Sequence, residues 1–477
     1  MTNRPTDPIR LHAAARPDHA AIVDLERGIT LGYAALHRRI AQAVAVLAAE
    51  AIGVGDRVAV LARNRADYVV LHMACARLGA ILVALNWRLT PAELVPLIAD
   101  SEPALIIGDA SIALLPDAVA AAHSLIDFDS FAARIDGATP DDRQGSDEDL
   151  PSLMLFTSGT SGQPKGALLS EKNLFLSSAS FVMMTGVSID SVFLCDSPLF
   201  HVLGLVTNVR APLMVGGTVL ISGGFDPATT LTRLSDPALR VSHYTCVPQM
   251  AEMLRRQPGF DPQKLKGLGV VTGGAPNPPP KIREWLADGI PLGNGYGMTE
   301  TGSLCGMPLN IALIEQRIES AGPVTPVVEL RIADAADQPM PPGAHGEIQI
   351  KGASLFSGYW RRPDANASAF SPDGFFRTGD VGRLDEAGYL YIALLAFPGL
   401  SEAAVVGVAD PQWGEVGAAA VVLRDGVSAT EADLHAHCAG LLARYKIPKR
   451  IAFMAHLPRN GAGKVLKADL RHHFMGG

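Results

Sequence analysis

Residues 155–166 read LFTSGTSGQPKG, an apolar pair followed by six small or hydroxyl residues and a closing lysine, Lys165, held between a proline and a glycine. Glycine-freed backbone N–H groups, hydroxyls and one lysine suit a polyphosphate, because anions are held by convergent donors and a mobile cation. The stretch is not a Walker A loop, which has glycine before the lysine and serine or threonine after it. A Gly/Ser surface linker is the alternative, so the stretch alone does not settle its role.

The chain before this stretch predicts a parallel sheet. Short apolar strands are expected at 57–62, 80–85 and 104–107, with a helix over 66–78, and this alternation favours right-handed crossovers. Another helix is expected to begin near residue 90. Thr90 can serve as its N-cap, Pro91 suits the first helical position, and Glu93 completes a capping box with Thr90. An acidic connector, 136–151, then leads into the apolar run before the opening stretch. The opening stretch therefore begins at the end of a predicted strand, and in open α/β sheets ligands bind at the ends of strands.

The rest of the chain predicts a second group of strands and a small final domain. Strand patterns occur at 270–274 and 347–352, and the pattern restarts after Gly388 with two strands, a helix from Glu431 and a late strand at 450–454. The predicted fold class is mixed α/β, with a large N-terminal body and a C-terminal domain of under a hundred residues.

Composition excludes several classes of protein. At 477 residues and 50.2 kDa the chain exceeds one hydrophobic core. A net charge of −8 without a Lys/Arg cluster argues against nucleic-acid binding. Five scattered cysteines indicate reduced, intracellular thiols. No signal peptide or uncharged membrane-length run is visible, so a cytoplasmic protein without a transmembrane segment is expected.

Three further motifs could contact a nucleotide. They are GGAP at 273–276, NGYGMTE at 294–300 and GFFRTGD at 374–380. Glycine-rich backbone lets an adenine ring lie close, Tyr296 can stack on it, Glu300 can hold Mg²⁺ and Asp380 can accept the ribose hydroxyls. Each motif taken singly could be an ordinary turn.

The four motifs in this order resemble the adenylate-forming superfamily, which includes acyl-CoA synthetases, firefly luciferase and the adenylation domains of peptide synthetases. The resemblance runs from LHAAARPDHAAIVD (11–24) to LPRNGAGKVLK (457–467). It implies a mixed α/β fold with a β-barrel-like subdomain and a mobile α+β lid. The implied domains are residues 1–392, which bind AMP and the acyl group, and residues 393–477, which carry a catalytic lysine.

The resemblance also implies residue roles. Thr157 to Lys165 form the phosphate-gripping loop, and Thr157 and Glu300 support Mg²⁺. The catalytic residues are Lys464, which bridges the carboxylate and the α-phosphate, Thr299 at the α-phosphate, Glu300, and His201 at the acyl-pocket mouth. The nucleotide-binding residues are Thr157, Ser158, Gly159, Thr160, Ser161, Gly162, Lys165, Gly274, Ala275, Pro276, Asn294, Gly295, Tyr296, Gly297, Met298, Thr299 and Asp380.

The acid is expected to be hydrophobic, a fatty or aryl carboxylic acid, because an isolated charge would be costly in an apolar pocket. The candidate pocket residues are Val202, Leu205, Tyr244, Met298 and Leu304. Amino-acid-activating members place an aspartate where this chain has His201. That histidine could instead pack within an apolar strand.

The implied reaction is ATP-dependent ligation of the acid to CoA through an acyl-adenylate, with release of pyrophosphate. Two alternatives remain: transfer to a carrier-protein phosphopantetheine thiol, and a nucleotide- or acyl-binding relative without turnover. The implied partners are the acid, ATP and CoA. The oligomeric state is open, a homodimer being one alternative.

The chain departs from the family at the junction of Ile392 and Ala393. Relatives carry there an Asp-Arg-x-Lys hinge and a Gly-Gly-Glu loop, which absorb the domain rotation and line the thiol tunnel. Either the segment is truly deleted, or the sequence as printed omits a mobile loop. The second explanation is favoured, because hinge segments are often mobile.

Overall fold

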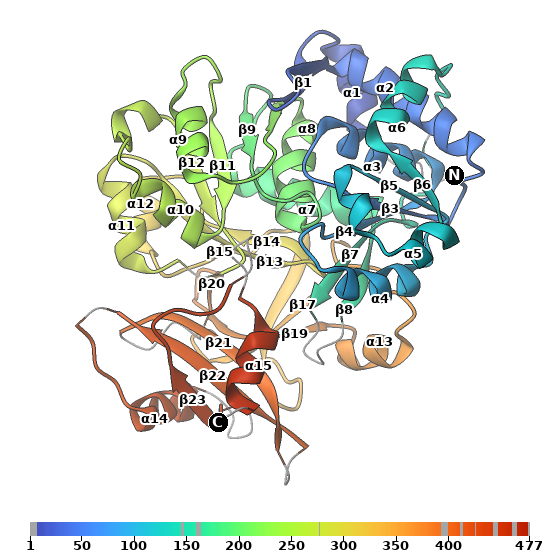
Figure 1. Cartoon of the computed structure of the whole chain (residues 1–477). Coiled ribbons are helices and arrows are strands. Elements are labelled where there is room, and N and C mark those ends of the chain that lie inside the picture. Colours follow the sequence, from blue (N-terminus) through green and yellow to red (C-terminus); the bar gives the residue numbers. More distant parts are fainter. Residues whose placement is uncertain are drawn as a thin grey trace.

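The protein has a large body and a smaller C-terminal unit, which lies against one end of it and is coloured orange to red in Figure 1. The computed structural model describes residues 7–143, 145, 147–158, 164–275, 277–392, 399–410, 414–424, 426–441, 447–459 and 465–475. Four sheets organise these residues, and the predicted mixed α/β class is confirmed.

A seven-stranded sheet contains the predicted parallel strands. Its order is β18-β8-β7-β4-β3-β5-β6, and β4, β3, β5, β6 and β7 run parallel. Its strands are β3 (Arg57–Leu61), β4 (Ile81–Leu85), β5 (Leu105–Gly108), β6 (Ser124–Asp127), β7 (Pro151–Ser158), β8 (Pro164–Ser170) and β18 (Gly358–Tyr359). The helices of this part are α2 (Tyr33–Ala49), α3 (Ala66–Leu78), α4 (Pro91–Ser101), the 3₁₀ helix η1 (Ala110–Leu114), α5 (Asp117–Ala122) and α6 (Phe128–Gly137).

Local signals set the helices of this sheet. The α3 helix spans its predicted residues and ends at Gly79, whose left-handed backbone (φ 74°) glycine adopts without strain. The capping box of α4 is formed, since the Glu93 carboxylate accepts from the Thr90 backbone N–H at 2.8 Å. The opening stretch leaves β7 at Ser158, as predicted, and β8 returns antiparallel from Pro164.

An eight-stranded sheet forms the other half of the body, in the order β14-β13-β12-β11-β9-β10-β1-β2. Its strands are β1 (Ala20–Asp24), β2 (Ile29–Gly32), β9 (Val192–Cys195), β10 (Thr218–Ile221), β11 (His243–Cys246), β12 (Gly269–Thr272), β13 (Leu292–Met298) and β14 (Gly302–Gly306). Its helices are α1 (Pro8–Ala15), α7 (Glu171–Thr185), the π-helix η2 (Leu203–Arg210), α8 (Ala211–Val215), α9 (Pro227–Ser235), α10 (Pro248–Arg255), the 3₁₀ helix η3 (Pro262–Leu265), α11 (Pro279–Ala287) and α12 (Ile311–Gln316). Strands β1 and β9 to β13 are parallel, so their carboxyl ends meet at one edge.

A third, antiparallel sheet stands where the β-barrel-like subdomain is expected. Its order is β15-β20-β19-β17-β16, and among the described residues no strand pair closes it, so it is an open sheet rather than a barrel. Its elements are β15 (Gly322–Pro323), β16 (Val328–Ala333), β17 (Gly346–Gly352), β19 (Phe376–Leu384) and β20 (Tyr389–Ile392), with α13 (Pro363–Ala369) between β18 and β19.

The C-terminal unit holds the predicted late strands and helix. Its sheet has the order β21-β22-β23, with β21 (Leu400–Asp410), β22 (Gly414–Leu423) and β23 (Arg450–Phe453), accompanied by α14 (Glu431–Leu441) and α15 (Lys467–Met475). The junction of Ile392 and Ala393, where the family hinge is missing, lies at the edge of residues 393–398, which are outside the described residues.

Two global predictions concern membranes and thiols. In the described part of the chain, no helix combines the length and apolarity that crossing a membrane requires.

All five cysteines are free, and Cys75, Cys195, Cys246 and Cys305 are buried. The core explains their burial, because its largest cluster joins strands of both large sheets and includes three of them.

Candidate functional site

A cavity of about 1310 Å³ lies where the sheets meet. The carboxyl edge of the eight-stranded sheet supplies residues that follow β9, β11 and β12, and the antiparallel sheet supplies β19. The C-terminal unit closes another side with Arg459, Val465 and Lys467. Segments that are far apart in the sequence therefore share one cavity, as the motifs predict.

Hydroxyl and carboxylate groups meet at one end of this cavity. Thr157, at the end of β7, donates from Oγ1 to Oε1 of Glu300 at 3.2 Å, and the hydroxyl of Tyr359 donates to the same oxygen at 2.9 Å. Glu300 is only 4% exposed, so these contacts offset part of its desolvation. The ammonium of Lys165 lies 5.1 Å from the centre of the Tyr359 ring, whose hydroxyl contacts the Glu300 carboxylate.

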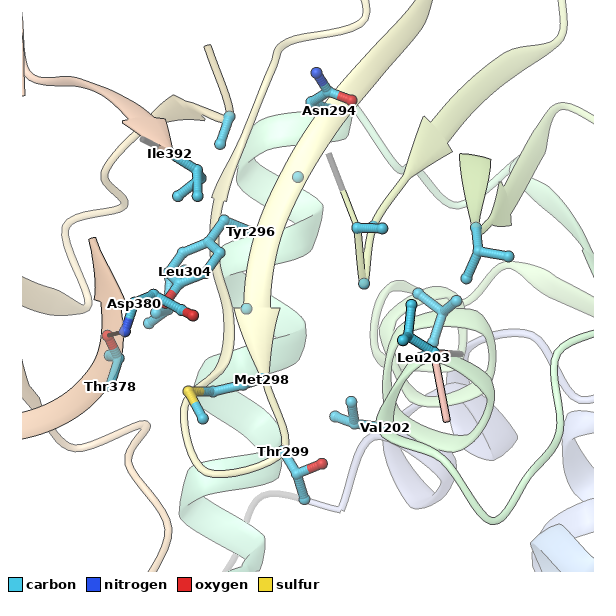
Figure 2. A pocket seen from close by; sticks show the side chains of 18 of the residues that line it. Val202, Leu203, Asn294, Tyr296, Met298, Thr299, Leu304, Thr378, Asp380 and Ile392 are labelled. Atoms are coloured by element: carbon cyan, nitrogen blue, oxygen red, sulfur yellow. Dashed lines mark hydrogen bonds between the residues drawn. The ribbon is translucent and has the colours of Figure 1, made fainter. Parts of the chain in front are cut away.

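Tyr296 and Asp380 are in direct contact in the wall of the cavity. Figure 2 shows Tyr296 on β13 pointing toward Asp380 and Thr378 on β19. The Tyr296 hydroxyl donates to Oδ2 of Asp380 at 2.8 Å. Burial raises the pKa of Asp380, and the Tyr296 hydrogen bond and the Lys467 ammonium oppose that shift. Burial also raises the pKa of Tyr296, so its hydroxyl remains a donor.

The glycine-rich motifs bring backbone to the cavity wall. Gly274 and Ala275 follow β12, and Asn294 lies beside them on β13, where its Oδ1 accepts from the Thr272 hydroxyl at 3.0 Å. A Cβ on Gly297 would lie 2.1 Å from the Gly302 carbonyl oxygen, so only glycine allows the β13–β14 hairpin to close there. The two motifs thus form adjoining surfaces against which a flat ring can lie.

The apolar side of the cavity comes from the segment around η2. His201 lies in the loop before η2 and lines the cavity, so it is not the strand histidine of the alternative reading. Val202 and Leu203 project from this segment on the side opposite Asp380, with Met298 and Thr299 at the end of β13 (Figure 2). Leu304 also lines the cavity.

Two residues expected in the pocket are buried elsewhere. Leu205 and Tyr244 are 0% and 1% exposed, and neither lines the cavity. Leu205 packs in the core that joins the large sheets, and Tyr244 packs in the core beneath α9 and α10. Both predictions were wrong because apolar character does not say which side of a strand or helix faces the cavity.

Part of the predicted site lies outside the described residues. Those residues are Gly159, Thr160, Ser161, Gly162, Pro276 and Lys464, and of Ser158 only the strand backbone is described. Val465, next in the chain to Lys464, lines the cavity. The remaining predicted residues Thr157, Lys165, His201, Gly274, Ala275, Asn294, Gly295, Tyr296, Gly297, Met298, Thr299, Glu300 and Asp380 all line it.

Sequence reasoning missed several residues of the cavity. Tyr359 lies 59 residues from its partner Glu300 and belongs to none of the four motifs. Asp196 and Thr245 line the cavity as buried polar side chains. A signal existed for Asp196, a charged residue that directly follows the apolar run 192–195.

Comparison with known proteins identifies the family. A model of the AMP-binding enzymes matches residues 9–360, and one of the AMP-binding enzyme C-terminal domain matches residues 392–464. The chain therefore belongs to the AMP-binding enzymes, the adenylate-forming superfamily that the motifs resemble.

Individual relatives match over nearly their full length. The chain is 34% identical to a feruloyl-CoA synthase of an Amycolatopsis species, over 94% of each sequence. It is 31% identical to ATP-bound MatB from Rhodopseudomonas palustris, with a TM-score of 0.80 over 98% of this chain and 99% of that one. The o-succinylbenzoate CoA synthetase (MenE) of Bacillus subtilis, solved with its acyl-adenylate intermediate, is 28% identical, with a TM-score of 0.78 over 99% of both chains.

Proposed function

We propose that this protein is an AMP-forming acid–CoA ligase that activates a fatty or aryl carboxylic acid as an acyl-adenylate and passes the acyl group to CoA. The observation that carries the proposal is the single cavity that Thr157, Glu300, Tyr296, Asp380 and the residue next to Lys464 share. The relatives that match along almost the whole chain include proteins named as acid–CoA ligases for aryl and fatty acids.

ATP occupies the nucleotide half of the cavity in this proposal. Adenine lies between the backbone of Gly274 and Ala275 and the Asn294–Tyr296 segment. Asp380 accepts hydrogen bonds from the ribose hydroxyls, for which its carboxylate has free lone pairs beside the one that Tyr296 uses. The loop from Thr157 to Lys165 holds the β- and γ-phosphates, and Thr299 contacts the α-phosphate.

Thr157 and Glu300 fit a magnesium ion. Both offer hard oxygen donors, 3.2 Å apart, and Mg²⁺ commonly takes only one or two protein ligands besides phosphate oxygens and water. Among the described residues no group of three or more His, Cys, Asp or Glu residues could hold a metal. When bound, Mg²⁺ would neutralise charge that develops on the phosphates.

The chemistry proceeds in two displacements. A carboxylate oxygen attacks the α-phosphorus, the bond to the β-phosphate oxygen breaks, and pyrophosphate leaves. Lys464 bridges the carboxylate and the α-phosphate, where a preorganised cation stabilises the added negative charge. The CoA thiol then loses its proton and attacks the acyl carbonyl, and AMP leaves with the bonding electron pair.

The proposal gives each of the two domains its own role. Residues 1–392 bind ATP and the acid, and residues 393–477 act as a lid that brings Lys464 to the nucleotide. Arg459, Val465 and Lys467 reach the cavity from the C-terminal unit, which supports this arrangement. His201, at the apolar side, borders the acyl group.

A panel of carboxylic acids tests the proposal directly. Aryl and fatty acids of graded length are each incubated with Mg·ATP, with and without CoA, and AMP, ADP, pyrophosphate and acyl-CoA are measured. Acid-dependent pyrophosphate release and CoA-dependent thioester formation are expected. Formation of ADP, or no acid-dependent pyrophosphate release with any member, contradicts the proposal. Thioester formation only on a carrier-protein phosphopantetheine, and not on CoA, identifies the carrier-loading alternative instead.

A further inference from the structure

A tyrosine outside the four sequence motifs contacts side chains of two of them. Tyr359 lies on β18 and lines the cavity. Its hydroxyl donates to Oε1 of Glu300 at 2.9 Å, and the ammonium of Lys165 lies 5.1 Å from the centre of its ring. One side chain therefore connects the carboxylate proposed for magnesium with the lysine proposed for the phosphates.

The two carboxylate oxygens of Glu300 have different surroundings. Oε1 accepts from the Tyr359 hydroxyl and, at 3.2 Å, from Oγ1 of Thr157. Oε2 receives no hydrogen bond from the described residues, although a carboxylate offers acceptor sites on both oxygens. Hydrogen bonds from neighbouring side chains orient the carboxylates that bind metals. The carboxylate is thus held through one oxygen and keeps the other for a cation.

The backbone of Tyr359 is fixed on two sides. On one side β18 pairs with β8, and the backbone N–H of Trp360 donates to the Gly166 carbonyl at 2.8 Å. On the other side Asn366 of α13 accepts from the Tyr359 backbone N–H at 2.7 Å and donates to its carbonyl at 3.0 Å. These contacts leave the ring little freedom to move relative to β8.

The same segment also holds the backbone of Glu300. The backbone N–H of Phe356 donates to the Glu300 carbonyl at 2.8 Å. The Phe356 ring meets the Tyr359 ring edge to face, with ring centres 4.7 Å apart. Because Glu300 lies in the turn between β13 and β14, residues 356–359 hold both its main chain and its side chain in place.

The ring of Tyr359 acts on Lys165 through its face. Lys165 is the second residue of β8, directly after the glycine-rich stretch, and it also lines the cavity. A lysine side chain is long and flexible, whereas an aromatic face attracts an ammonium electrostatically. The ring contact therefore restricts where the Lys165 ammonium lies.

We propose that Tyr359 is a positioning residue for Mg·ATP: its hydroxyl orients the Glu300 carboxylate toward the magnesium ion, and its ring holds the Lys165 ammonium for the β- and γ-phosphates. This inference rests on the proposed function, because it adds a residue to the same nucleotide site. The hydroxyl and the ring have separate effects, so different variants test them.

Tyr359→Phe tests the hydroxyl, because it keeps the ring. The Kd for ATP is measured by calorimetric titration in excess Mg²⁺ and in EDTA, without acid. The ratio of the two Kd values, which gives the tightening by Mg²⁺, should fall about tenfold in Tyr359→Phe, as for other residues that orient metal ligands. The Kd in EDTA should not change. An unchanged ratio overturns the role of the hydroxyl.

Tyr359→Leu tests the ring, because it removes the aromatic face as well. In EDTA, the preference for ATP over AMP should fall about three- to tenfold in Tyr359→Leu and stay normal in Tyr359→Phe, since only the first loses the cation–π contact. General damage to the site would weaken ATP and AMP binding equally. Equal weakening, or an unchanged preference in Tyr359→Leu, overturns the role of the ring.

Tyr33→Phe is the matched control. Tyr33 is a buried tyrosine of α2 that does not line the cavity, and its hydroxyl donates to the Gly217 carbonyl at 2.7 Å. Its loss should leave the Mg²⁺ ratio and the preference for ATP over AMP unchanged. If Tyr33→Phe changes them as much as the Tyr359 variants do, the inference is overturned.

The unaltered protein separates this inference from the proposed function. Acid-dependent pyrophosphate release by the unaltered protein, with normal ratios in both Tyr359 variants, overturns the inference alone. If the unaltered protein binds no ATP in either condition, the proposed function fails and the inference fails with it.

Discussion

At the scale of single residues, Asp380 is expected to make nucleotide binding depend on pH. Burial raises its pKa above the ordinary value of about 3.9, and an ionised carboxylate accepts from the ribose hydroxyls more strongly than a protonated one. As pH falls through this raised pKa, Asp380 takes up a proton and ATP affinity should fall. We expect the Kd for ATP to begin rising at a higher pH than an unperturbed carboxyl would give, as measured by calorimetric titration from neutral pH downward.

Asp380→Asn should weaken ATP binding about ten- to a hundredfold at neutral pH, since charge-assisted hydrogen bonds are lost. It should also remove the acid-side change in Kd. The pKa of Asp380 is higher in the folded chain than in the unfolded chain, so its contribution to the free energy of unfolding falls as the pH rises through the folded-state pKa. At neutral pH the uncharged side chain of the Asp380→Asn variant avoids this cost. The urea midpoint of the variant should therefore be equal to or higher than that of the unaltered protein. Unaltered ATP affinity in Asp380→Asn would refute the ribose contact.

Residue identities in the site were predictable only where a motif carried them. Thr157, Glu300 and Asp380 stand in short patterns whose glycines and hydroxyls suit phosphate and ribose, and the structure brings them to one cavity. Tyr359 completes the Glu300 contact through tertiary packing, which no local spacing encodes. Asp196 was missed for a similar reason, since a lone acidic residue after a strand is usually solvated.

At the scale of elements, the π-helix η2 positions the apolar side of the cavity, where the acyl group lies in the proposal. A Cβ on Gly204 would lie 2.1 Å from the Pro198 carbonyl oxygen, so the helix packs directly on the loop that carries His201. Gly204→Ala should shift this loop and raise KM for the acid more than KM for ATP, with a loss of stability of about 1–3 kcal/mol from overpacking. Steady-state kinetics and urea unfolding measure the two effects.

Gly137→Ala is the control for this substitution. Gly137 ends α6, and a Cβ there would meet no atom within 4 Å. It should leave both KM values and the unfolding midpoint almost unchanged. Equal changes in the two KM values of Gly204→Ala would contradict a specific role of η2 in the acyl side.

The elements differ in how far the sequence predicts them. Apolar strands, amphipathic helices and caps are local properties, which explains why α3 and the capping box of α4 were predicted with their bounds. The π-helix was not predicted, because its wider turn is set by packing rather than by apolar spacing. The open third sheet departs from the barrel-like expectation for a similar reason, since closure depends on pairing between distant strands.

At the scale of the whole molecule, strand order is set by contacts that the sequence does not display. Strand β10 pairs with β1, although Leu220 and Val23 are separated by almost two hundred residues. Periodicity predicts the strands themselves and the family resemblance predicts the domains, but neither predicted this strand order. The same long-range pairing creates the shared cavity, so the site is a property of the assembled body and lid.

The lid makes the last prediction possible, because it separates the two half-reactions. Val465 and Lys467, which follow Lys464 in the sequence, line the cavity, and the Lys464 ammonium acts in the proposal only on attack at the α-phosphorus. Lys464→Ala should reduce acid-dependent pyrophosphate release on the order of a hundred- to a thousandfold and leave the Kd for ATP unchanged. When the acyl-adenylate is supplied ready-made, CoA should still be acylated at nearly the normal rate, since that step no longer needs charge stabilised on phosphorus. Unchanged pyrophosphate release would refute the role of Lys464. Equal loss of both half-reactions would instead indicate that this part of the lid supports the closed cavity as a whole.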